Sequence, residues 1–98
     1  MVLLHPSTAI TYDNLALLMY HMGDLRTSAY YLFRTFNIYE SISGSEHTNT
    51  KKLRKHLLRV VNEYLDQGNS EANLDKCLVV WLDKNRDDED VSEWIDGK

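Results

Sequence analysis

The chain has 98 residues, with 11 Lys and Arg against 15 Asp and Glu, so its formal net charge is −4. A single cysteine excludes an internal disulfide framework and a metal site built from several thiolates of one chain. No apolar run approaches the ~18 residues that a membrane span needs, and a net acidic chain is atypical of nucleic-acid-binding proteins. We therefore expect one soluble domain in the cytoplasm, where a lone thiol stays reduced.

The first predicted helix follows Pro6, with Ser7 or Thr8 as its N-cap, and it ends at Gly23. Glycine enters the left-handed conformation of a helix C-cap at little cost, which is why Gly23 marks the end. Apolar side chains recur along this segment at helical spacing and predict its buried stripe: Tyr12, Leu15, Ala16, Met19 and Met22.

The second predicted helix runs from about residue 25 to about 42 and is broken by Ser43-Gly44-Ser45. Its apolar stripe is rich in aromatic side chains: Leu25, Ala29, Leu32, Phe33, Phe36 and Tyr39. Together with Tyr30 and Tyr31, these rings have two interpretations. They form either core packing or a platform on which nucleic-acid bases stack.

The third predicted helix begins between Thr48 and Thr50 and ends at Gln67-Gly68-Asn69. Its apolar stripe is clear: Leu53, Leu57, Val60, Val61 and Tyr64. Five cations fall within nine residues of this segment with no acid among them: Lys51, Lys52, Arg54, Lys55 and Arg59. The third helix is therefore predicted to carry a basic face.

The fourth predicted helix begins at Asn69 or Ser70. Its apolar stripe has strong amphipathic spacing: Leu74, Cys77, Leu78, Trp81 and Leu82. On that stripe Cys77 is expected to behave as a small buried hydrophobe rather than a reactive thiol. From Asp83 the chain turns acidic, and residues 83–98 carry the whole net charge, because residues 1–82 hold eight basic and eight acidic residues.

This pattern predicts an all-α fold of two antiparallel helical hairpins, about 7–42 and about 48–84. They form a helical domain over residues 1–84, followed by an acidic tail over residues 85–98 with a short terminal helix at most. The two hairpins are related in sequence at an offset of 42 residues. His5-Pro6-Ser7-Thr8 recurs as His47-Thr48-Asn49-Thr50, and Leu15 and Leu18 correspond to Leu57 and Val60.

The sequence resembles the 42-residue tetratricopeptide repeat of kinesin light chains and of clustered-mitochondria proteins. The resemblance rests on His5-Pro6-Ser7-Thr8-Ala9, Asn14-Leu15-Ala16-Leu17-Leu18, Gly23-Asp24-Leu25, Ile38-Tyr39-Glu40 and Gly44-Ser45-Glu46-His47. It departs from the pattern where Thr48 replaces a proline, Lys51 replaces a small residue and Thr35 replaces an alanine. It implies an α-solenoid in which the first helix of each hairpin lines a concave groove.

The resemblance implies that this groove binds a peptide. From the first hairpin it exposes Asp13, Asn14, Leu17 and Tyr20, with Asn14 at the position where the family holds peptide backbone. From the second it exposes Lys52, Lys55, His56 and Arg59, which share one helix face. A row of cations in a concavity attracts carboxylates, so an acidic partner peptide is expected; the alternative is a merely solvated basic face.

The tail segment Glu93-Trp94-Ile95-Asp96 is similar to the tryptophan-acidic peptides that kinesin light chains bind. We expect Trp94 either to dock into the groove or to cap the helical stack. The leading interpretation is therefore a cytoplasmic protein–protein adaptor. The alternatives are an RNA-associated helical repeat domain and a non-catalytic repeat domain of a larger protein, and self-association stays open as a further partner call. No catalytic constellation, metal-ligand motif or cofactor motif is present, and the His residues at positions 5 and 47 are read as helix-start residues.

Overall fold

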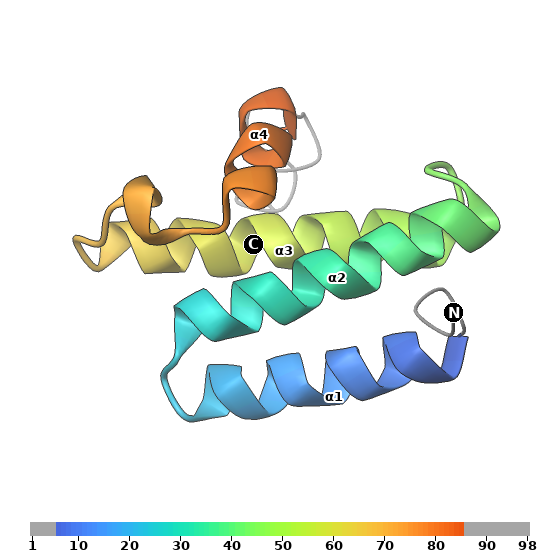
Figure 1. Cartoon of the computed structure of the whole chain (residues 1–98), viewed down its shortest axis with the longest axis horizontal. Coiled ribbons are helices and arrows are strands. Elements are labelled where there is room, and N and C mark those ends of the chain that lie inside the picture. Colours follow the sequence, from blue (N-terminus) through green and yellow to red (C-terminus); the bar gives the residue numbers. More distant parts are fainter. Residues whose placement is uncertain (1–5, 86–98) are drawn as a thin grey trace, which may run out of the picture.

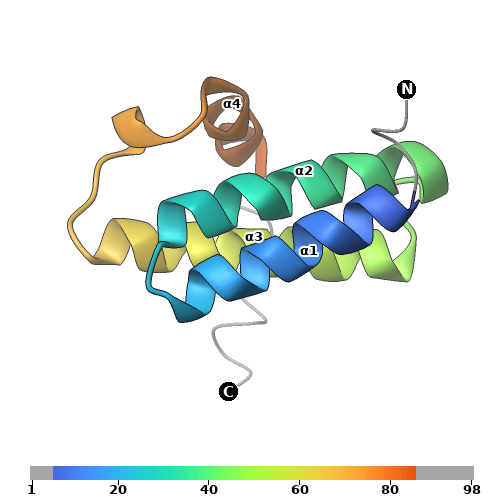
Figure 2. The same cartoon turned by 60° about the horizontal axis from the view of Figure 1, so that its bottom comes forward.

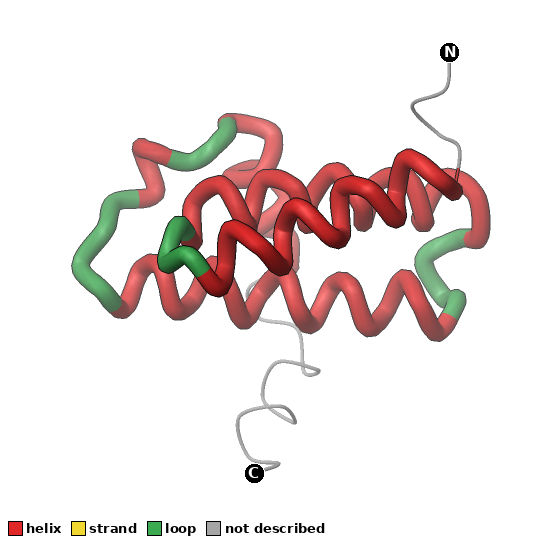
Figure 3. The backbone as a smooth tube through the Cα atoms, turned by 90° about the horizontal axis from the view of Figure 1, so that it is seen from below, coloured by secondary structure: helices red, strands yellow, loops and turns green. Residues whose placement is uncertain are grey.

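A computed structural model describes residues 6–85, and this part of the chain is helical without any strand (Figures 1 and 3). Its elements are α1 (Pro6–His21), α2 (Leu25–Ser43), α3 (Thr48–Asp66), the 3₁₀ helix η1 (Glu71–Asn73) and α4 (Lys76–Asn85). The predicted all-helical class is thus confirmed. Among the described helices, none has both the length and the apolar character that crossing a bilayer requires.

The three long helices run along the long axis of the molecule in alternating directions (Figures 1 and 2). α2 packs against both α1 and α3, so α1 and α3 point the same way. α1 begins at Pro6 and α3 begins at Thr48, which is the offset of 42 residues seen in the sequence. Proline fits the first helical position because its missing N–H would have no intrahelical acceptor there.

A tight turn joins α1 to α2. Gly23 adopts φ +87°, in the left-handed region that glycine favours, and the Asp24 N–H donates to the carbonyl of Met19 at 2.9 Å. The Asp24 carboxylate then accepts from the N–H of Thr27 at 3.1 Å and caps α2. With so short a connection, the two helices must lie side by side and antiparallel.

Small side chains let α1 and α2 approach closely. Ala16, Ser28 and Ala29 are each at most 1% exposed. The Ser28 hydroxyl donates to the backbone carbonyl of Ala16 at 2.8 Å, which ties the two helices together. One member of the predicted α1 stripe is misplaced, because Met22 is 68% exposed.

The fourth helix begins later than predicted, at Lys76 rather than at Asn69 or Ser70. Ser70 does act as a cap, but its hydroxyl accepts from the N–H of Ala72 and closes only the short η1. The backbone is extended again at Leu74, and the Asp75 carboxylate accepts from the N–H of Cys77 at 3.1 Å. Asp75 is therefore the N-cap of α4.

The late start changes which side chains α4 buries. Leu78 and Leu82 are buried, and the Trp81 ring packs edge-on against Phe36 with centroids 5.4 Å apart. Cys77 is exposed, so the prediction that it packs in the apolar stripe is wrong. In Figures 1 and 2 α4 is steeply inclined to α3 instead of running back along it.

One hydrophobic core joins all four α-helices. Its buried members are Ala16, Leu25, Ala29, Leu32, Phe33, Phe36, Leu53, Leu57, Leu58, Val60, Val61, Tyr64, Leu74, Leu78 and Leu82. Phe33 and Phe36 belong to this core, as expected if the aromatic stripe on α2 serves core packing. Thr35 is fully buried and donates its hydroxyl to the carbonyl of Tyr31 at 2.9 Å.

Candidate functional site

A groove lies between α1 and α3, with α2 as its floor. Its cavity of about 200 Å³ is floored by Ser28 and Leu32 of α2, with Ala16 of α1 beside them. The side walls consist of Asp13, Leu17 and Tyr20 from α1 and Lys52, Leu53 and His56 from α3. α1 and α3 point the same way along the two sides of this groove (Figure 1).

The groove continues toward the start of α3. A second cavity of about 240 Å³ shares Asp13, Lys52 and Leu53 with the first and adds Tyr39 and Asn49. The shared residues make the two cavities one elongated depression, which we call the α1–α3 groove. An elongated depression suits an extended segment better than a compact ligand.

The structure brings together five of the eight predicted peptide-binding residues. Asp13, Leu17, Tyr20, Lys52 and His56 line the α1–α3 groove. The other three do not line it: Asn14, Lys55 and Arg59. Asn14 is exposed and Lys55 is half-buried away from the groove lining, because one residue along a helix turns the side chain by about 100°.

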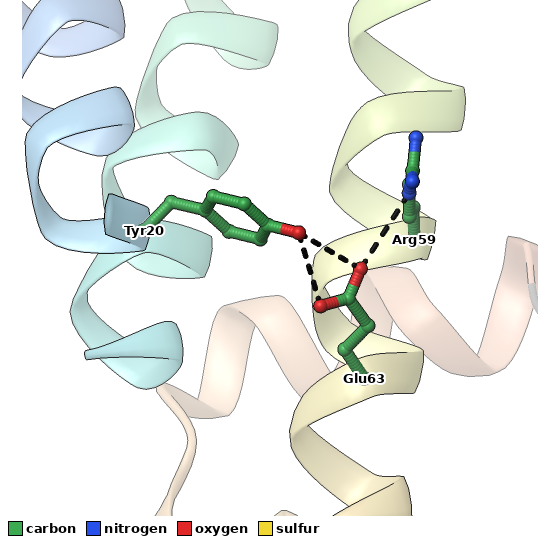
Figure 4. Close-up of polar contacts among 3 residues, drawn as sticks. All are labelled: Tyr20, Arg59 and Glu63. Atoms are coloured by element: carbon green, nitrogen blue, oxygen red, sulfur yellow. Dashed lines mark hydrogen bonds and ion pairs between the residues drawn. The ribbon is translucent and has the colours of Figure 1, made fainter. Parts of the chain in front are cut away.

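Arg59 serves the groove indirectly, through a residue that the sequence reasoning missed. Its Nε lies 3.5 Å from Glu63, and the Glu63 carboxylate accepts a hydrogen bond from the Tyr20 hydroxyl on α1 (Figure 4). Tyr20 and Glu63 are 43 positions apart. The sequence does indicate that Glu63 lies near Arg59, because the two are four positions apart on one helix face. It gives no indication that Tyr20 contacts Glu63.

The contact with Glu63 also sets the acidity of Tyr20. The hydrogen bond that the phenol donates to the carboxylate raises the pKa of Tyr20 above its usual 10.0, because a phenolate has no proton to donate. Burial and the negative charge of Glu63 raise that pKa further, while Arg59 partly opposes them. Tyr20 therefore stays a neutral donor throughout the physiological range.

The α3 wall of the groove offers cationic and hydrogen-bonding side chains to a ligand. Lys52 and His56 form no ion pair within residues 6–85, whereas neighbouring Lys51 pairs with Glu46 at 3.3 Å. The opposite wall supplies the aliphatic chain of Leu17, which is 51% exposed. Among the described residues that line the groove, Asp13 supplies the one carboxylate.

The remaining histidine and tail predictions fall elsewhere. His47 is the N-cap of α3, where its Nδ1 accepts from the N–H of Asn49 at 3.1 Å. Between residues 6 and 85, no three His, Cys, Asp or Glu side chains lie together in a way that could hold a metal ion. Trp94 and the acidic segment around it lie outside the described residues.

The α1–α3 groove thus combines an apolar floor, a wall with Lys52 and His56, and a wall with Asp13 and Leu17. Comparison of the chain with protein-family models, with curated proteins and with solved structures finds no match.

Proposed function

We propose that this domain is a protein–protein interaction module that binds an extended acidic segment of a partner in the α1–α3 groove. One observation carries the proposal: Lys52 and His56 face Leu17 and Tyr20 across an elongated depression. Carboxylates of a bound segment would pair with the α3 wall, while an apolar side chain would contact Leu17 and the floor. Charges then fix the register, and the apolar anchor supplies most of the affinity.

The repeated organisation of the chain supports this proposal. α1 and α3 begin 42 positions apart, run in the same direction and both pack on α2. This is the relationship expected of the tetratricopeptide-like pattern in the sequence, whose first helices line a ligand groove. An adaptor of this kind would act in the cytoplasm, where the exposed thiol of Cys77 would remain reduced.

The chain itself contains a segment with the chemistry that the groove would recognise. Residues 86–98 hold six acidic residues and Trp94. We propose that this tail competes with partner peptides for the groove, with Trp94 as its anchor. Attachment to the same chain would give the tail an effective concentration in the millimolar range, so even weak docking would reduce the affinity for partners.

A direct binding measurement tests the peptide site. The full chain is titrated with a fluorescent peptide copied from residues 86–98, and anisotropy reports the affinity. We expect Lys52→Glu to weaken binding about threefold to tenfold, because it removes an attraction and adds a repulsion. Lys55→Glu is the matched control, since it makes the same charge change outside the groove lining.

Equal loss in Lys52→Glu and Lys55→Glu would indicate non-specific attraction and would contradict a site in the groove. A single-stranded RNA of similar charge is titrated in parallel. Binding of the RNA in preference to the peptide, with a steep salt dependence, would replace the peptide proposal by the nucleic-acid alternative. Deleting residues 86–98 tests the tail, because competition predicts a higher peptide affinity in the shortened chain and also in Trp94→Ala.

A further inference from the structure

A second cavity lies between α2 and the start of α4, and we call it the α2–α4 pocket. Its volume of about 340 Å³ falls within the range of small-molecule pockets. The lining consists of Tyr30, Phe33, Arg34, Asn37, Ile38, Asp75 and Cys77. None of these residues lines the α1–α3 groove, so the two sites are separate.

The α2–α4 pocket combines an apolar base with a polar rim. Phe33 and Ile38 are 8% and 4% exposed and form the base, whereas Asn37 and Cys77 are exposed at the rim. Phe33, Arg34 and Asn37 share one face of α2, because they follow one another at helical spacing. An apolar base with a few polar groups beside it is the usual composition of a ligand pocket.

Two tyrosines hold the Arg34 guanidinium in a defined orientation. It donates hydrogen bonds to the hydroxyls of Tyr30 at 3.1 Å and Tyr12 at 3.4 Å. Its Cζ also lies 5.4 Å from the ring centroid of Tyr12 and 5.7 Å from that of Tyr30. The Tyr12 ring is itself stacked on Tyr31, with centroids 5.7 Å apart. These neutral rings orient the cation, but they do not neutralise its charge.

The positive charge of Arg34 lacks a carboxylate partner within residues 6–85, whereas Arg59 pairs with Glu63. A guanidinium has five N–H donors in a planar fork, and this fork matches the two oxygens of a carboxylate. Asp75 belongs to the α4 side of the pocket, where its carboxylate accepts from the N–H of Cys77. One added negative charge would therefore balance the pocket, and a dianion such as a phosphate monoester would meet repulsion from Asp75.

We propose that the α2–α4 pocket binds a small carboxylic acid that carries an apolar body. The ligand carboxylate pairs with the Arg34 fork and accepts a hydrogen bond from the Asn37 amide. The apolar body of the ligand contacts Phe33 and Ile38 at the base. Arg34 is oriented before the ligand arrives, so little side-chain entropy is lost on binding.

The single cysteine of the chain provides the test, because Cys77 lines this pocket and is exposed. The full chain is labelled with N-ethylmaleimide, which is neutral and has no attraction to Arg34. The probe ligand is 3-phenylpropionate, and 3-phenylpropanol is its uncharged counterpart of the same size. We expect a dissociation constant of about 1 mM for the acid, so about 10 mM acid should slow labelling about fivefold. The same concentration of the alcohol should leave the rate nearly unchanged.

Variants of the rim identify the groups that hold the carboxylate. Arg34→Gln should abolish the protection of Cys77, because it removes the charge and the fork. Arg26→Gln is the matched control: it makes the same charge change two turns earlier on α2, outside the pocket lining. Asn37→Asp is a second variant, which adds a repelling carboxylate at an exposed position and leaves both tyrosine contacts of Arg34 in place. Circular dichroism verifies that each variant keeps its helix content.

Four outcomes would overturn the proposal. The first is an unchanged labelling rate of the wild type in the acid, and the second is equal protection by the alcohol. The third is protection that persists in both Arg34→Gln and Asn37→Asp, or that Arg26→Gln abolishes as fully as Arg34→Gln. The fourth is protection by a glycyl-glycyl-phenylalanine tripeptide at lower concentrations than by 3-phenylpropionate, which would replace the small acid by the carboxyl terminus of a peptide.

Discussion

The Tyr20 hydroxyl lies 3.1 Å from each carboxylate oxygen of Glu63, and this shared hydrogen bond is a polar link between α1 and α3 across the groove (Figure 4). It joins residues 43 positions apart. α1 and α3 otherwise meet mainly through α2, which packs against both. The link therefore fixes the width of the groove at the end opposite Asn49.

Replacing Tyr20 with Phe should destabilise the fold by about 1 kcal/mol, because it removes one hydrogen bond to a charged acceptor that remains partly solvated. For a domain of this size the expected fall in Tm is about 4–8 °C. Thermal unfolding measures it. Tyr39→Phe is the matched control, since no hydrogen bond of the Tyr39 hydroxyl occurs within residues 6–85. Equal losses in the two variants would show that the link to Glu63 contributes nothing.

The raised pKa of Tyr20 predicts a pH effect of defined sign. The hydrogen bond to Glu63 raises the folded-state pKa above 10.0, the usual value that applies to the unfolded chain. The folded state then binds the proton more tightly, so this contribution to stability is complete below about pH 10 and is lost as pH rises through the folded pKa. Unfolding free energies at rising pH should show the advantage of the wild type over Tyr20→Phe shrinking above pH 10.

Ultraviolet titration of tyrosinate absorbance provides the control. The wild type should contain a tyrosine whose pKa is raised above the usual 10.0, and Tyr20→Phe should lack it. Glu63→Gln should return Tyr20 toward the usual pKa, because it removes the carboxylate acceptor and its charge. A late-ionising tyrosine that survives Tyr20→Phe would assign the shift to another residue.

The close contact of α1 with α2 predicts intolerance of larger side chains. Ala16→Leu should cost about 1–3 kcal/mol, because the Ala16 side chain is 1% exposed and the Ser28 hydroxyl lies 2.8 Å from its carbonyl oxygen. Asn14→Leu places the same side chain on the exposed side of the same helix, where the change should stay within about 0.5 kcal/mol. Urea unfolding of dilute chains compares them. Tolerance of Ala16→Leu would mean that α1 and α2 are spaced more widely.

The helix pattern could be predicted where local chemistry decides the structure. Gly23 and Gly44 follow helix ends at positive φ, which glycine adopts at little cost. The spacing of Leu53, Leu57 and Val60 identifies the buried face of α3. The predicted start of α4 at Ser70 was wrong because Ser70 caps η1, the short helix that precedes α4. Which of two capping residues starts the longer helix depends on how Leu74 and Leu78 reach the core, which local sequence does not encode.

The candidate site was predictable in outline only. Helical spacing put Lys52, His56 and Arg59 on one face, and the structure keeps the first two in the groove. Arg59 pairs instead with Glu63, four positions on along the same helix, and the hydrogen bond that Tyr20 donates to Glu63 is a tertiary contact that has no local signal. Cys77 was misassigned for the same reason as α4, since its position on the stripe followed from the wrong helix start.

Two buried threonines offer a matched test of hydrogen bonding. Thr50 is 1% exposed and its hydroxyl has no hydrogen-bond partner among residues 6–85, whereas the equally buried Thr35 donates to Tyr31. Thr50→Val keeps the shape and removes an unsatisfied group, so we expect it to raise stability by about 1 kcal/mol. Thr35→Val should be neutral or destabilising. Urea unfolding of both variants measures the contrast, and a loss of stability in Thr50→Val would indicate a partner for its hydroxyl.

The start of α4 depends on Asp75, whose carboxylate accepts from the N–H of Cys77. Asp75→Ala should therefore cost about 1 kcal/mol and should speed hydrogen exchange at the Cys77 amide. Ser70→Ala removes the cap of η1 alone and should leave that amide unchanged. Exchange measured by NMR separates the two, because Cys77 reports on the first turn of α4 directly. Faster exchange at Cys77 in Ser70→Ala than in Asp75→Ala would move the start of the helix back to Ser70.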